Sequence, residues 1–110
     1  MTTDWPWVTV KDLIDRGAIP VPVTLYGERS GQKFQVILEQ DGSFVWRDQS
    51  FGSPSVAAGR IITLTFNERT PGRSYFAVNG WKFWKLRGSD GNLRTLGEIR
   101  DEAKTGAAPG

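Results

Sequence analysis

Residues 53–60 read Ser-Pro-Ser-Val-Ala-Ala-Gly-Arg, and this stretch predicts the beginning of a helix. Ser53 is a favourable N-cap residue, and Pro54 suits the first helical position because the N–H that it lacks would be unpaired there anyway. The backbone N–H groups at such a helix start are unpaired and attract anions. We therefore expect Ser53 and Ser55, with the neighbouring N–H groups, to hold a phosphate.

A second stretch, residues 79–86, reads Asn-Gly-Trp-Lys-Phe-Trp-Lys-Leu and places three aromatic rings among two lysines. Basic groups interleaved with aromatic rings are typical of surfaces that bind nucleic acid. Trp81 and Trp84 would supply ring faces, while Asn79 would either fix a turn or contact a base edge. In an extended conformation Trp81 and Phe83 would share one face and Trp84 the other, so only one face would enter the core.

The composition limits the classes of function open to the chain. A chain of 110 residues with 38% hydrophobic and 24% charged residues is typical of one soluble domain. Because the sequence contains no histidine and no cysteine, it lacks Ser-His-Asp triads, cysteine nucleophiles and the usual zinc sites. It also has no long apolar run and no signal peptide pattern, so we expect a cytoplasmic protein away from the membrane. We expect no enzymatic activity and no cofactor.

Positive charge is concentrated in the segment that carries the aromatic rings. Residues 59–94 contain seven basic and two acidic residues, whereas residues 1–58 contain five basic and seven acidic residues. A local excess of positive charge attracts a polyanion in a salt-sensitive way. The basic residues that we expect to contribute are Arg60, Arg73, Lys82, Lys85 and Arg87.

The first half of the chain predicts a short helix followed by three strands. Thr9 can cap a helix that Gly17 ends, and strands are expected at residues 23–26, 33–39 and 43–47. Asp41-Gly42 is a strong hairpin turn between the last two strands. These segments predict an antiparallel meander.

The second half predicts further helices around that meander. The helix capped by Ser53 is expected to reach about residue 65, although residues 61–66 also have strand propensity. Residues 75–78 form a short apolar run that fits a strand, and Thr95 with Glu98 forms a capping box that opens a helix to about Lys104. We therefore predict a single α+β domain over residues 1–104, a small antiparallel meander packed with short helices, and a flexible tail over residues 105–110.

Three residues near the C-terminus have the types found in a metal-dependent nuclease. Such a site needs carboxylates that converge on Mg²⁺ and a lysine beside the attacking water. Asp90, Glu102 and Lys104 have these types, but the last two lie at the end of a predicted helix, where they would point in different directions. Solvated surface charge accounts better for these residues.

The sequence resembles the RAMA domain, a family named from its association with restriction enzymes and adenine methylases. The resemblance covers roughly residues 9–101 and is carried by stretches in the family's order: residues 11–17, 41–42, 53–58, 79–85 and 96–100. It implies a reader of modified DNA, with N6-methyladenine as the favoured mark. It also implies a methylase or nuclease partner, which we expect to be a separate polypeptide.

Taken together, the motifs and the resemblance predict a non-catalytic DNA-binding module. The expected contacts are Ser53, Ser55, Arg60, Arg73, Asn79, Trp81, Lys82, Trp84, Lys85 and Arg87. The alternative is a protein-interaction or assembly module of a restriction or phage-defence system, with the aromatic rings against a partner subunit. Salt separates the two, because DNA binding weakens steeply with added salt and an apolar protein interface barely responds.

Overall fold

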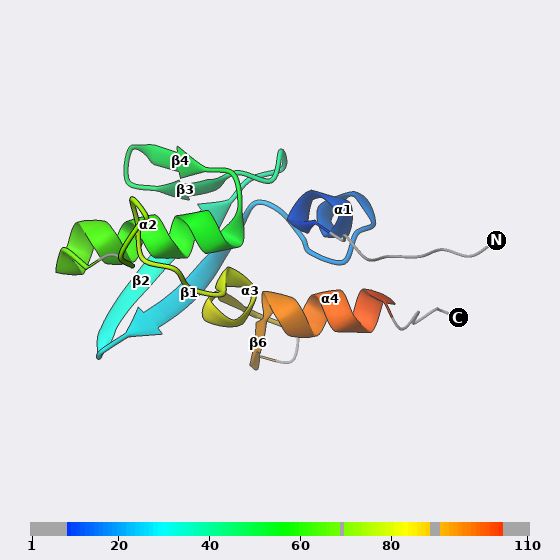
Figure 1. Cartoon of the computed structure of the whole chain (residues 1–110). Coiled ribbons are helices and arrows are strands. Elements are labelled where there is room, and N and C mark those ends of the chain that lie inside the picture. Colours follow the sequence, from blue (N-terminus) through cyan, green and yellow to red (C-terminus); the bar gives the residue numbers. More distant parts are fainter. Residues whose placement is uncertain (1–8, 69, 89–90, 105–110) are drawn as a thin grey trace.

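The computed structural model describes residues 9–68, 70–88 and 91–104, and these residues form one antiparallel sheet with four helices (Figure 1). The predicted α+β class is confirmed. None of the described helices has the length and apolar character needed to cross a membrane. In chain order the elements are α1 (Val10–Asp15), β1 (Val23–Arg29), β2 (Gln32–Leu38), β3 (Phe44–Trp46), β4 (Gln49–Phe51), α2 (Pro54–Phe66), α3 (Gly80–Phe83), β5 (Lys85–Arg87), β6 (Leu93–Thr95) and α4 (Leu96–Lys104).

The sheet has the strand order β4-β3-β2-β1-β5-β6. Strands β1–β4 form consecutive hairpins, β5 and β6 form a further hairpin, and the two groups meet where β5 pairs with β1. The β1–β2 pair is the longest, running in register from Val23 opposite Leu38 to Arg29 opposite Gln32. The predicted meander is confirmed, but β1 extends beyond residue 26 because the turn uses only Ser30 and Gly31, both at positive φ. Strands β4 and β6 were not predicted.

The helix that begins after Ser53 is confirmed, and the alternative of a strand at residues 61–66 is wrong. Ile61 and Ile62 are fully buried on α2, which ends at Asn67 in the left-handed conformation. The predicted strand at residues 75–78 is also wrong, because this segment runs irregularly against α2. There the N–H of Phe76 donates to Oγ1 of Thr63 at 2.9 Å rather than to a neighbouring strand.

The extended conformation considered for residues 81–86 is wrong for residues 81–83, which form a helical turn, and is confirmed for residues 85–86, which lie in β5. Asn79 is the N-cap of α3, and its Oδ1 accepts from the N–H of Trp81 at 3.0 Å. The helical turn ends at Trp84, whose backbone N–H donates to the carbonyl of Gly80, and strand β5 follows directly. The aromatic side chains therefore follow helical spacing and do not alternate between two faces.

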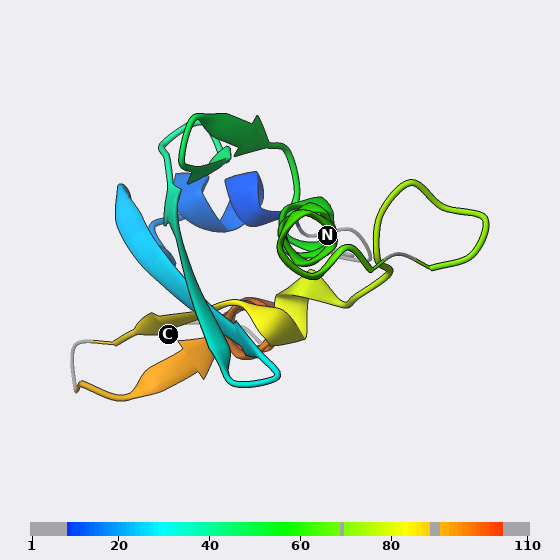
Figure 2. The same cartoon turned by 90° about the vertical axis from the view of Figure 1, so that its left-hand side faces the viewer.

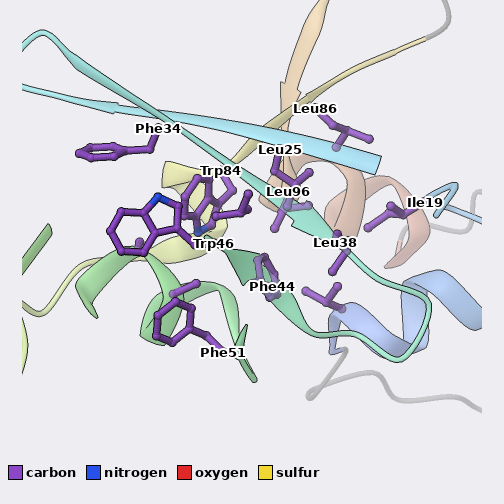
Figure 3. Packing of buried hydrophobic residues seen from close by; sticks show 14 of the residues in the cluster. Ile19, Leu25, Phe34, Leu38, Phe44, Trp46, Phe51, Trp84, Leu86 and Leu96 are labelled. Carbon is purple, nitrogen blue, oxygen red and sulfur yellow. The ribbon is translucent and has the colours of Figure 1, made fainter. Parts of the chain in front are cut away.

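The core lies on one face of the sheet. Buried residues of the strands, including Leu25, Leu38 and Phe44, pack with Ile19 and with residues of α1, α2, α3 and α4 in one cluster (Figure 3). On β2 the intervening residues, Lys33, Gln35 and Ile37, are exposed. Figure 2 looks along α2 and shows the curvature of the β1–β2 hairpin. The face of β2 opposite to the core is thus exposed.

The first and last helices begin as predicted. Thr9 and Asp12 form a capping box at α1, with backbone-to-side-chain hydrogen bonds of 3.0 and 3.1 Å. Thr95 and Glu98 do the same at α4, at 2.8 and 3.0 Å. The predicted tail at residues 105–110 lies outside the described residues.

Candidate nucleic-acid interface

The two stretches singled out in the sequence contact one another in the structure. The N–H of Gly80 donates to Oγ of Ser55 at 2.9 Å, and Nε1–H of Trp84 donates to the carbonyl of Pro54 at 3.0 Å. The backbones are so close that a Cβ on Gly80 would lie 2.1 Å from the carbonyl carbon of Pro54. We call this arrangement of Pro54, Ser55, Gly80 and Trp84 the α2–α3 contact.

The α2–α3 contact gives the two serines roles within the protein. Oγ of Ser53 accepts from the N–H of Val56 at 3.2 Å, and Oγ of Ser55 accepts from Gly80. Pro54 is the first residue of α2 and Gly80 packs against it, and both residues are buried. These contacts explain both serines without a ligand, and phosphate binding by Ser53 and Ser55 stays a prediction.

The two tryptophans of the second stretch have different environments. Trp84 has 0% of its surface exposed and packs edge-to-face on Phe83, with ring centroids 4.8 Å apart. Because a ring without exposed surface cannot stack on a base, the interpretation of Trp84 as a DNA-contacting residue is wrong. Trp81 is half-buried, and the guanidinium of Arg100 lies 4.3 Å from the centre of its indole ring.

Three of the five predicted basic residues gather at one groove. Lys82 on α3 and Lys85 and Arg87 on β5 are exposed and line it together. Arg60 and Arg73 do not line the groove: the guanidinium of Arg60 lies 5.2 Å from the ring centre of Tyr75, and Arg73 lies in the loop after α2. The predicted cationic surface is therefore only partly assembled. Asn79 is exposed beside it as the cap of α3.

This groove, which we call the hairpin groove, lies where β1 and β5 separate. In the described part of the chain the register joins these strands through one pair, Tyr26 opposite Lys85. The groove has a volume of about 750 Å³, which is within the size range of small-ligand sites. It is lined by Tyr26, Gly27, Glu28, Ser30, Lys33, Phe34, Gln35, Lys82, Phe83, Lys85, Arg87 and Leu93.

The charge of the hairpin groove is positive. Four basic side chains line it, and Glu28 is the one acidic residue among the lining residues. None of the described residues forms an ion pair with Lys33, Lys82 or Lys85. Arg87 donates from Nη1 to the carbonyl of Gly91 at 2.7 Å, which holds its side chain against the segment between β5 and β6. Uncompensated cations around a concave surface favour an anionic ligand.

The sequence reasoning missed Lys33, Tyr26 and Phe83 as groove residues. The alternation of β2 could have placed Lys33 and Gln35 on an exposed face. No local signal indicates that this face adjoins α3 and β5, because that depends on the pairing of β1 with β5 across the chain.

The acidic residues near the C-terminus do not form a metal site in the described residues. Glu102 forms an ion pair with Arg94. Asp90 and the side chain of Lys104 lie outside the described part of the chain. No group of three or more residues with suitable side chains converges on a metal-sized space in the part that the structure describes.

A comparison with protein families gives one match. Residues 2–105 match the model of the family described as Restriction Enzyme Adenine Methylase Associated (RAMA), which covers both stretches and the hairpin groove. No curated protein matches the chain.

Proposed function

The chain belongs to the RAMA family, and from this premise we propose that it is a non-catalytic DNA-binding module that reads N6-methyladenine. The family's name associates it with restriction enzymes and adenine methylases. A domain that recognises the methylase product suits a restriction-modification or defence system in the cytoplasm. Its effector would be a methylase or nuclease.

The observation that carries this proposal is the hairpin groove. It joins Lys82, Lys85 and Arg87 with Lys33 from a distant strand, and the aromatic rings of Tyr26 and Phe83 line the same concave surface. Lysine and arginine side chains bind DNA chiefly by neutralising phosphates and releasing counterions. Aromatic rings add contacts to bases that depend little on sequence.

The test is a titration of matched methylated and unmethylated duplexes at two salt concentrations, followed by fluorescence anisotropy. The variant Lys82→Ala/Lys85→Ala/Arg87→Ala should bind at least about tenfold more weakly at low salt. The slope of log K against log salt concentration is negative, and its magnitude should decrease by about 0.9 for each phosphate contact removed. The double variant Ser53→Ala/Ser55→Ala tests whether the helix start holds a phosphate. After correction for its folded fraction, loss of a true phosphate contact would also decrease the magnitude of this slope.

A matched control removes the same charge elsewhere. Lys11, Arg16 and Arg47 are exposed and do not line the hairpin groove, so their triple alanine variant should keep its affinity. Equal losses in both triple variants would mean that only net charge matters. No binding of the wild type at low salt would reject the DNA-binding proposal, and equal affinity for both duplexes would reject modification reading alone.

A protein-interaction module is the second candidate, and exposed apolar side chains favour it. Leu64 is 56% exposed on α2, and Ile37 and Leu93 are 43% and 44% exposed on the sheet. A subunit held through these residues would stay bound as salt rises. Pull-down of a candidate methylase subunit at low and high salt, with Leu64→Ser as the variant, tests this function.

A further inference from the structure

We propose that the hairpin groove takes one unpaired adenine nucleotide, with its base on the open part of the Phe83 ring and its phosphates on the lysines. This inference rests on the proposed function and deepens it, because it names the unit of DNA that the site holds. The source is a nucleotide extruded from the duplex. The alternatives, a nucleotide of a single strand or a free nucleotide, are separated by the test.

The shape of the interface favours a single nucleotide over an intact duplex. Bases within a duplex are most often read by a helix that enters the major groove. Here α3 has four residues, and the first turn of α2 is packed against it, so neither helix start projects. The basic residues line a concave surface of about 750 Å³, which is large enough for one nucleotide.

Phe83 is held in place before any ligand arrives. Its ring lies on Gly27 of β1, where a Cβ would come within 2.3 Å of the ring carbon Cε2. Its ring also packs edge-to-face on Trp84, and the ring centroid of Phe34 is 6.4 Å away. Despite these neighbours, Phe83 is half-buried and lines the groove. A rigid ring with an open part loses little conformational freedom when a base stacks on it.

The polar residues of the groove are arranged so that the two ends of a nucleotide can be distinguished. The basic residues Lys82, Lys85 and Arg87 come from α3 and β5, whereas Glu28 comes from β1, opposite Lys33 in the register of the hairpin. A phosphate is attracted to the α3–β5 side, whereas the charge of Glu28 is offset by Lys33 opposite it. The exocyclic amine of adenine can donate to Glu28, and an N6-methylated amine still retains one N–H for this bond.

The test compares two duplexes that differ in the free energy needed to unpair the target adenine. A duplex whose target adenine faces an abasic site has already lost its base pair, so extrusion costs less than in the paired duplex. We expect the wild type to bind it at least about fivefold more tightly than the fully paired duplex, and the gain should disappear in Phe83→Leu. Phe66→Leu is the matched control: Phe66 is a half-buried ring against Phe34, at 6.2 Å, and does not line the groove.

A second variant keeps the inference testable if Phe83→Leu destabilises the fold. Glu28 is exposed, so Glu28→Ala should fold normally and should lose the preference for adenine over purine, the same base without its amine. Glu39→Ala, outside the groove, should retain this preference.

The outcomes separate the inference from the function on which it rests. If the wild type and Phe83→Leu both bind the abasic-site duplex and the fully paired duplex with equal affinity, the inference is overturned and the DNA-binding proposal stands. Free deoxyadenosine monophosphate or a single strand binding as tightly as the abasic-site duplex would overturn the assignment of an extruded nucleotide. No binding to any DNA at low salt would overturn both.

Discussion

At the level of single residues, the contact between α2 and α3 depends on the hydrogen atom that Gly80 carries in place of a side chain. The nearest atoms to an added Cβ are the carbonyl carbon and oxygen of Pro54 and the N of Ser55, at 2.1–2.3 Å. These are backbone atoms, so a change of rotamer cannot make room. The hydrogen bonds of Ser55 and Trp84 both depend on this approach.

We therefore expect Gly80→Ala to destabilise the protein by about 3 kcal/mol, because overpacking would separate the two helices and strain both hydrogen bonds. The measurement is the free energy of unfolding in urea. Gly52→Ala is the control, since a Cβ there has no neighbour within 4 Å, and it should change stability by less than about 0.5 kcal/mol. Equal effects of the two substitutions would contradict the importance of the α2–α3 contact.

The roles of individual residues were harder to predict than their importance. The sequence singled out Ser55, Gly80 and Trp84 as parts of two key stretches. It suggested contacts with DNA for Ser55 and Trp84, where the structure has contacts within the protein. Lysines on either side of Trp84 in sequence suggested exposure. The turn of α3 instead directs this ring into the core, while Lys82 and Lys85 stay exposed.

At the level of elements, helix starts with local signals were predictable. The caps at Thr9, Ser53 and Thr95 depend on side chains within three residues, and all three helices begin there. Helix α3 was not predicted, because four residues are too few to be stable alone. Its position depends on Ser55 and Pro54, about 25 residues away in the chain.

The cap of α1 leads to a prediction about pH. The backbone N–H of Thr9 donates to the Asp12 carboxylate and lowers the pKa of that group below its usual value of 3.8. A lowered folded-state pKa contributes stability that is present above the unfolded-state pKa and is lost as pH falls through the folded-state pKa. Asp12→Ala should therefore be less stable than the wild type near neutral pH, and the difference should shrink below about pH 3.8.

Urea unfolding from pH 7 down to acidic pH measures this difference. The pKa of Asp41 is also lowered, by the hydrogen bond from the N–H of Ser43, so Asp41→Ala should follow the same course. Stability curves of wild type and Asp12→Ala that stay parallel throughout the acidic range would contradict the proposed role of the cap.

At the level of the whole molecule, the sequence predicted the sign of the charged surface better than its location. The excess of positive charge in residues 59–94 is real, but Arg60 and Arg73 lie away from the hairpin groove. Lys33, from the half of the chain with more acidic residues, joins the groove instead. Five elements between Tyr26 and Leu93 form this surface, so its composition follows from the strand order and not from any one stretch.

If the hairpin groove is the DNA surface, amide hydrogen exchange should slow on one part of the molecule only. Addition of a duplex should protect the end of the β1–β2 hairpin near Lys33 and the corner between α3 and β5. Amides of α1 and of β3–β4 should exchange as before, and the triple variant at Lys82, Lys85 and Arg87 should lose the protection. Protection confined to the start of α2 would instead favour the helix-end phosphate site.

The single residue pair between Tyr26 and Lys85 has a mechanical consequence. A long ladder would fix the angle between two hairpins, whereas one pair fixes only a pivot, and the packing of Phe83 against Gly27 sets the rest. The angle between the β1–β2 hairpin and the β5–β6 hairpin therefore depends on side-chain packing more than on a backbone ladder. The width of the hairpin groove is thus set chiefly by the Phe83 ring on Gly27.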